Sequence, residues 1–156
     1  MEQKPLVTVL MGSCNPRWDR LRRAVESLRG QTLTQWELVL WDDGSDSQGA
    51  MALEQAASLD SRVRLYHCRE NHGLGYALNR CMERSHGTFF ARLDDDDWCH
   101  PRRLERQVRF LQTHPAYGWV GCSARLVDRW GVWGVLTVPE EPGPRDFLPH
   151  SPYVHP

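Results

Sequence analysis

The chain has 156 residues, a net charge of −1, and a composition that is 40% hydrophobic and 25% charged. This is the profile of a folded globular domain, and it gives no electrostatic case for nucleic acid or an acidic membrane surface as a partner. Five scattered cysteines without a C-x-x-C pair argue against a disulfide framework or a zinc site and indicate a reducing cytoplasm. The longest early apolar run, residues 6–11, is too short for a signal core or a membrane span.

Short β-rich segments alternate with amphipathic ones along the first 113 residues. The sequence predicts strands at 6–11, 37–41, 63–66 and 88–93. It predicts helices around 21–28, 50–57 and 77–82, and one that begins at Pro101. In the second helix, Met51 is expected to face inward. Such alternation is typical of an α/β fold, with an open, mostly parallel sheet and helices on both faces.

The C-terminal region has a different pattern. Residues 119–122 are a candidate fifth strand, and residues 126–138 predict a β-hairpin. Six of the ten prolines lie in residues 139–156, so this stretch is expected to be an extended tail. We expect a single domain over residues 1–156, with exposed apolar surface near 119–138 that favours self-association.

An acidic run, Asp94 to Asp97, directly follows the predicted fourth strand. Two like charges about 4 Å apart repel by about 4 kcal/mol at an effective dielectric of about 20. The run is therefore either a solvated acidic turn or a site for a cation, and oxygen ligands suit Mg²⁺ or Mn²⁺. Ligands of open α/β sheets bind beyond the carboxyl ends of the strands, which favours the cation.

Two more polar loops follow predicted strands, at residues 12–15 and 42–46. Each has a simple structural alternative, because Asp-Gly is a common turn and Ser45 or Asp46 can cap a helix. Together with the acidic run, however, they place three polar loops at one sheet edge. A divalent ion there indicates a phosphate-bearing ligand. No P-loop motif occurs, and residues 73–78 have only two of the three glycines of a dinucleotide-binding motif.

The order and spacing of these motifs closely resemble family 2 glycosyltransferases with the GT-A fold. The resemblance covers roughly residues 5–123. The stretches that carry it are 7–15, 27–32, 36–45, 71–79, 87–97 and 114–121.

The resemblance implies a nucleotide-sugar site. Asp43 would read the base by accepting the uracil N3–H. Asp94 and Asp96 would form the D-x-D pair that holds Mn²⁺ or Mg²⁺, although the fourfold run leaves the register open to Asp95. The implied nucleotide-binding residues are Gly12, Ser13, Asn15, Asp43, Gly73, Asn79, Asp94 and Asp95. His72 lies near this pocket, and Trp98 is the best candidate for a ring that faces the ligand.

The implied reaction moves a sugar from a nucleotide-diphospho-sugar, a UDP-sugar in the first instance, to a hydroxyl acceptor with inversion. The acceptor is left open between a saccharide, a lipid-linked and a protein acceptor. The family's general base comes from a later stretch, so we expect it beyond Pro156 and expect this chain to be truncated. The alternative is a nucleotide-sugar-binding domain that lacks the base. The implied location is cytoplasmic, with a peripheral place at the inner membrane face as an option.

Overall fold

The computed structural model describes residues 4–143 and 145, which form two compact units, one up to Val108 and one from Arg109 on. The expectation of a single domain stays a prediction. The elements are β1 (Val7–Ser13), α1 (Trp18–Arg29), β2 (Trp36–Asp43), α2 (Ser47–Ala57), β3 (Val63–Cys68), α3 (Leu74–Glu83), β4 (Phe89–Arg92), α4 (Arg103–Thr113), β5 (Ala124–Asp128) and β6 (Gly131–Leu136).

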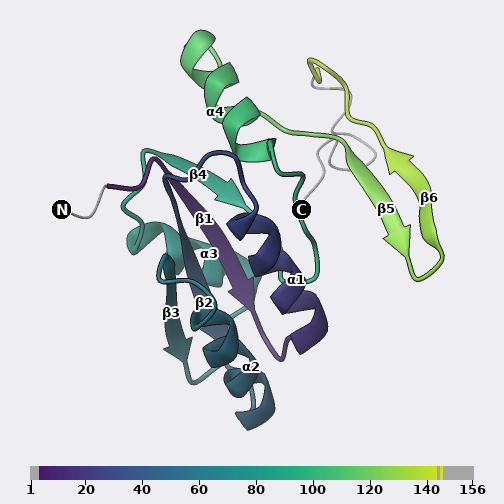
Figure 1. Cartoon of the computed structure of the whole chain (residues 1–156). Helices are drawn as coiled ribbons and strands as arrows, with labels where there is room; N and C mark the ends of the chain where they lie inside the picture. Colours follow the sequence, from purple (N-terminus) through teal and green to yellow (C-terminus); the bar gives the residue numbers. More distant parts are fainter. Residues whose placement is uncertain (1–3, 144, 146–156) are drawn as a thin grey trace. The chain divides into compact units, whose positions relative to one another are not determined.

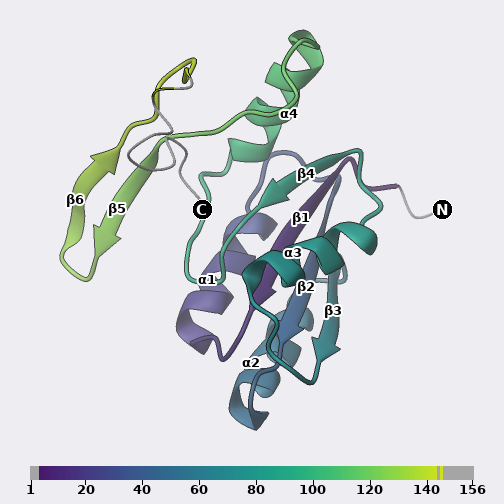
Figure 2. The same cartoon turned by 180° about the vertical axis from the view of Figure 1, so that it is seen from behind.

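The first unit is built on a four-stranded sheet in the order β3-β2-β1-β4, and every pair of neighbours is parallel. Helices α1 and α2 cover one face, and α3 covers the other (Figure 1, Figure 2). This confirms the predicted α/β fold with helices on both faces. Because the strands are parallel, all four carboxyl ends lie at one edge, and the loops after them meet there.

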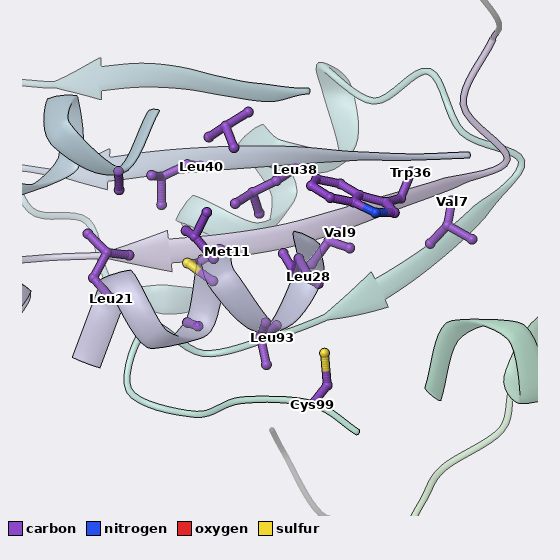
Figure 3. Close-up of a cluster of buried hydrophobic side chains, with 14 of the residues drawn as sticks. Val7, Val9, Met11, Leu21, Leu28, Trp36, Leu38, Leu40, Leu93 and Cys99 are labelled. Carbon is purple, nitrogen blue, oxygen red and sulfur yellow. The ribbon is translucent and has the colours of Figure 1, made fainter. Parts of the chain in front are cut away.

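Alternate residues of β1 and β2 fill two separate cores. Val9, Met11 and Leu38 point toward α1 and α2 and form the larger core with Leu21 and other buried apolar side chains (Figure 3). On the opposite face, residues such as Val39 pack under α3 in a smaller core. All eight residues of β2 are buried, as expected for a central strand covered on both sides.

Gly12 explains how α3 packs so closely on β1. A Cβ atom at this position would lie 2.8 Å from the Cβ atom of Ala77 and 3.2 Å from Cδ1 of Leu74. Only glycine leaves room for the helix at this distance. In the structure, Gly12 is therefore a packing position.

Three details of the predicted elements are wrong. Residues 119–122 form no strand, and β5 starts only at Ala124. Met51 is 64% exposed, because α2 buries the face that carries Ala52 and Leu53, and Met51 lies outside that face. Pro101 lies in a turn two residues before α4, where its carbonyl accepts a hydrogen bond from the backbone N–H of Thr32.

The second unit contains the predicted hairpin, in which β5 and β6 pair antiparallel. Its apolar side chains are largely exposed, with Trp130 at 81% and Trp133 at 66%. The expected apolar surface is thus present, and self-association stays a prediction. Residues 139–143 of the predicted tail have no helix or strand, whereas residues 144 and 146–156 lie outside the described part. Among the helices of the described residues, none is both long and apolar enough to cross a membrane.

Candidate functional site

The strand ends bring the three predicted loops together at the carboxyl edge of the sheet. The register pairs Ser13 with Asp42 across β1 and β2, and Asp43 with Cys68 across β2 and β3. The polar residues that end β1, β2 and β3 therefore lie side by side. We call the part of the edge around Asp43 the β2 end, and the part around residues 94–97 the acidic run.

Asp43, at the β2 end, is buried and is held by two backbone hydrogen bonds. Its Oδ2 atom accepts hydrogen bonds from the backbone N–H groups of His72 (3.0 Å) and Gly73 (2.7 Å). The residue is 3% exposed, and its Oδ1 atom is buried without a hydrogen-bond partner. Buried carboxylate oxygens are rarely left unpaired, so this atom is a free acceptor held in a fixed position.

Gly44 allows the loop that holds Asp43 to come so close. Its φ of +81° is a left-handed conformation, and a Cβ atom there would lie 2.7 Å from the backbone nitrogen of Asn71. Beyond this loop, the rings of His72 and Tyr76 stack with centroids 4.5 Å apart. The buried carboxylate is thus bordered by backbone N–H groups and by flat ring surfaces.

Asp42 points to a different network. It accepts a hydrogen bond from the backbone N–H of Ser45 (2.9 Å), and its Oδ2 atom lies 2.7 Å from Nδ1 of His67. The other ring nitrogen of His67 is 2.9 Å from Oε1 of Glu54. The hydrogen bond with Asp42 raises the pKa of His67, the contact with Glu54 adds to this, and burial opposes it. These contacts hold α2 and the loop before it against the ends of β2 and β3.

Asn15 joins the first loop to the second. Its backbone N–H donates to Oγ of Ser45 (2.9 Å), and its side-chain oxygen accepts from the backbone N–H of Asp46 (2.8 Å). Asp46 in turn caps α2 by accepting from Gly49. Asn15, predicted to line the nucleotide pocket, thus has its amide oxygen committed to a bond between loops. The helix-capping interpretation of Asp46 is confirmed.

Positive side chains neutralise part of the acidic run. Both carboxylate oxygens of Asp94 accept hydrogen bonds from the guanidinium of Arg92, at 2.9 and 2.8 Å. Asp96 is half-exposed and has one ion pair, 3.3 Å from Arg20. Arg23 lies over the ring of Trp98, 3.9 Å from its centroid, so this predicted ligand-facing ring is covered on one side by a cation.

The other carboxylates of the run are partly buried and are destabilised in their charged form. Asp95 accepts a hydrogen bond from the Ser13 hydroxyl, which ties the run to the end of β1. Burial raises the pKa of Asp95, and repulsion from Asp96 and Asp94 adds to it, against the Ser13 hydrogen bond. Burial and the same two neighbours also raise the pKa of Asp97. A cation beside these carboxylates would relieve this repulsion.

The carboxylates of the run do not form a complete metal cage. Among the described residues, the side chains that converge as three possible metal ligands are Asp43, Cys68 and His72, and the acidic run forms no such group. Mg²⁺ and similar ions are commonly held by one or two carboxylates together with substrate phosphates. The donor set of the run therefore fits a hard divalent ion whose coordination is completed by a ligand.

Gly73 and Asn79, both predicted site residues, lie at different distances from Asp43. Gly73, at φ +88°, lies directly before α3 and donates to Asp43, as described above. Asn79 is exposed and six residues further along α3, about 9 Å along the helix axis at about 1.5 Å per residue. The sequence interpretation also missed Arg20 and Arg23. Their signal was available, since the first turns of a helix that follows a strand lie at the strand's carboxyl end.

Comparisons with known proteins agree with this geometry. The family model described as glycosyl transferase family 2 matches residues 8–149. EpsE of Bacillus subtilis (strain 168), which is named as a glycosyltransferase, is 36% identical over 156 residues, covering 99% of this chain and 56% of EpsE. The amylovoran biosynthesis glycosyltransferase AmsE of Erwinia amylovora is 36% identical over 115 residues, 72% of this chain and 42% of AmsE. The chain thus spans about half the length of these relatives.

Solved structures show the same fold. TarS of S. aureus, residues 1–349, in complex with UDP-GlcNAc, gives a TM-score of 0.63 at 22% identity, over 70% of this chain and 32% of TarS. The mannosyltransferase PcManGT of Pyrobaculum calidifontis, in complex with GDP-Man and Mn²⁺, gives a TM-score of 0.63 at 22% identity, over 82% of this chain and 37% of PcManGT.

Proposed function

The chain belongs to family 2 of the glycosyltransferases, and from this premise we propose that it binds a UDP-sugar along the carboxyl edge of its sheet, as the donor-binding part of a metal-dependent, inverting transferase. The uracil base of the nucleotide would lie at the β2 end, and its diphosphate would lie at the acidic run. Ser13, at the end of β1, lies between the two and is hydrogen-bonded to Asp95.

The unpaired Oδ1 atom of Asp43 is the observation that carries this proposal. A buried anionic acceptor without a donor fits a ligand that brings an N–H group, and the imide N3–H of uracil is such a donor. A hydrogen bond to a charged group contributes about 1.5–3 kcal/mol. The two backbone N–H groups on Oδ2 keep the carboxylate oriented before the ligand arrives, so little ordering cost remains at binding.

At the acidic run, Asp96 is the proposed direct ligand of Mn²⁺ or Mg²⁺. It is half-exposed and has a single ion pair at 3.3 Å, whereas Asp94 is already bound at both oxygens by Arg92. When bound, the metal would neutralise the negative charge that the departing nucleoside diphosphate develops. Asp94 and Asp95 would border it, and Arg20 and Arg23 on α1 add positive charge close by.

Calorimetry with UDP, with and without Mn²⁺, tests this proposal. We expect Mn²⁺ to raise the affinity of the wild type for UDP at least tenfold and to leave that of Asp96→Ala unchanged. Asp19→Ala is the matched control, because Asp19 is an exposed aspartate on α1 whose ion pair is with Arg17. No binding of UDP in any condition would overturn the donor site, and equal binding with and without Mn²⁺ would overturn the metal's part in it.

A binding domain without turnover is the second candidate, the alternative that the sequence left open. Transfer with inversion needs a general base for the acceptor hydroxyl, whereas binding of the donor alone does not. Release of UDP from a UDP-sugar in the presence of a saccharide acceptor would select the transferase. Metal-dependent binding of UDP without such release would select the binding domain.

A further inference from the structure

Three side chains with different ligand atoms converge at the β2 end, and the nucleotide site does not account for two of them. Asp43 and Cys68 end neighbouring strands and are paired in register. His72 follows on the next loop, where its backbone N–H donates to Asp43. A carboxylate oxygen, a sulfur and a ring nitrogen from these residues all lie within 4.8 Å of one another.

We propose that Asp43, Cys68 and His72 form a binding site for a soft divalent cation of the Zn²⁺ type, separate from the hard-cation site at the acidic run. Sulfur, imidazole and carboxylate are the ligands that Zn²⁺ takes in proteins, whereas Mg²⁺ and Mn²⁺ prefer oxygen alone. Zn–S and Zn–N bonds of about 2.3 and 2.0–2.1 Å at a tetrahedral angle place the two ligand atoms about 3.6 Å apart. The Sγ atom of Cys68 and Nδ1 of His72 are 3.7 Å apart.

The burial of the three residues suits this site. Asp43 is 3% exposed, and its Oδ1 atom is buried without a partner, so a cation would satisfy an acceptor that the protein leaves open. Cys68 is half-buried, and His72 is exposed, which leaves an entry for the ion from solvent. Three protein ligands leave the fourth tetrahedral position for water or another small ligand.

Binding changes the protonation of the two softer ligands. Without metal, Nδ1 of His72 lies 2.9 Å from the carbonyl oxygen of Glu70 and donates its proton there. To offer the electron pair of Nδ1 to the metal, the neutral ring must carry its proton on Nε2 instead, whereas the Cys68 thiol releases its proton to solvent and binds as the thiolate. The ligands come from the register of β2 and β3 and from the loop beyond. The sequence shows no zinc motif because Asp43 lies far from Cys68 and His72 along the chain, and the three ligands meet only when it folds.

The soft cation and the nucleotide would compete, a consequence that rests on the proposed role of Asp43 in base recognition. The same Oδ1 atom cannot bind Zn²⁺ and accept the N3–H of uracil at once. Zn²⁺ at the β2 end is therefore expected to weaken UDP binding, whereas Mn²⁺ at the acidic run is expected to strengthen it.

Cobalt(II) is the direct probe, because thiolate bound to Co²⁺ gives a charge-transfer absorption that oxygen and nitrogen ligands do not. We expect the wild type to bind one Co²⁺ with this absorption, Zn²⁺ to displace it, and Cys68→Ser to lose it together with at least tenfold of the Zn²⁺ affinity. Cys122→Ser is the matched control, since Cys122 is also half-buried and lies outside the group. Thermal melting of each variant shows that it is folded.

The site is overturned if the wild type shows no thiolate absorption, or if the absorption persists in Cys68→Ser or is lost in Cys122→Ser. A competition arm separates this from the proposed function. Zn²⁺ should weaken UDP binding by the wild type and leave UDP binding by Cys68→Ser nearly unchanged. An absorption that depends on Cys68, together with undiminished UDP binding in Zn²⁺, would support the metal site and remove Asp43 from base recognition.

Discussion

The β2 end and the acidic run are both anionic, but the protein holds their carboxylates by different means. At the β2 end, backbone N–H groups from the loop after β3 fix one carboxylate, and glycine at position 44 lets that loop approach. At the acidic run, four carboxylates share one turn, and arginine side chains on β4 and α1 offset part of their charge. One end is ordered before any ligand arrives, and the other stores repulsion that a cation relieves.

This difference predicts what each end contributes to binding. A prearranged acceptor selects a ligand by its hydrogen-bond pattern, so changes at the β2 end should alter which base is bound, with or without metal. A cluster of negative charges has no such hydrogen-bond pattern. Changes at the acidic run should therefore alter only the increase in UDP affinity that Mn²⁺ causes. Four substitutions test this division.

Asp43→Asn should have the largest effect on the ligand. The amide oxygen can keep the bonds from His72 and Gly73, which turns the Nδ2 donor toward the place of the free Oδ1 atom. That donor would face the N3–H of uracil, whereas N3 of cytosine is an acceptor. We expect UDP affinity to fall about 10- to 100-fold. Calorimetry should also show that the preference for UDP over CDP shrinks or reverses.

The comparison of UDP with CDP shows whether Asp43→Asn alters recognition of the base or damages the loop in general. If Asp43→Asn weakens UDP and CDP by the same factor, then Asp43 orders the loop and does not read the base. If UDP affinity is unchanged, the β2 end is not the base site.

Gly44→Ala should damage the β2 end through the backbone. The substitution forces a left-handed conformation on alanine and places its Cβ atom 2.7 Å from the backbone nitrogen of Asn71. We expect a loss of about 1–3 kcal/mol in the free energy of unfolding, measured with urea, and weaker UDP binding with and without Mn²⁺. Gly75→Ala is the control, because a Cβ atom there meets nothing within 4 Å. Equal stability of the two variants would contradict a strained, close-packed loop at Gly44.

Asp95→Asn should stabilise the protein while it weakens the metal dependence of UDP binding. Burial and the neighbouring aspartates raise the pKa of Asp95, so the folded state pays for its ionisation as the pH rises above the ordinary carboxyl pKa of about 3.9. We expect a gain of about 0.5–2 kcal/mol in the free energy of unfolding at pH 7, which narrows as the pH falls toward that value. In the same variant, Mn²⁺ should raise UDP affinity less than in the wild type.

A loss of stability in Asp95→Asn at pH 7 would show that the Ser13 hydrogen bond outweighs the stored repulsion. The acidic run would then be an ordered structural turn, the alternative that the sequence left open.

The contrast also explains how much of the molecule the sequence could predict. The four strands and their helices follow from local patterns, because neighbours such as Leu38 and Val39 are both apolar and face the two opposite cores. The parallel sheet then places Ser13, Asp43 and the acidic run at one edge without any knowledge of side-chain geometry. Composition at strand ends was therefore enough to predict which polar loops meet at that edge.

Side-chain partners could not be predicted in the same way. Nothing in the sequence indicates that the side-chain oxygen of Asn15 accepts a hydrogen bond from Asp46. Nor does it indicate that Ala77 leaves no room for a side chain at Gly12. These contacts depend on distances between loops that meet only in the folded chain. The prediction for Met51 failed for a related reason, since the packing of α2 on the sheet buries the face with Ala52 and Leu53, and Met51 lies outside that face.

His67→Gln should have the smallest effect, and its pH dependence identifies the cause. The hydrogen bond with Asp42 raises the pKa of His67, so its contribution is fully present below the ordinary histidine pKa of about 6.5 and is lost as the pH rises through the raised value. Because the ring is partly exposed, we expect the variant to lose only about 0.2–1 kcal/mol at pH 6, and less at pH 9. Urea unfolding at the two pH values measures the difference. A loss that is the same at both would mean that the imidazole contributes by packing alone, and that its positive charge adds nothing to the contact with Asp42.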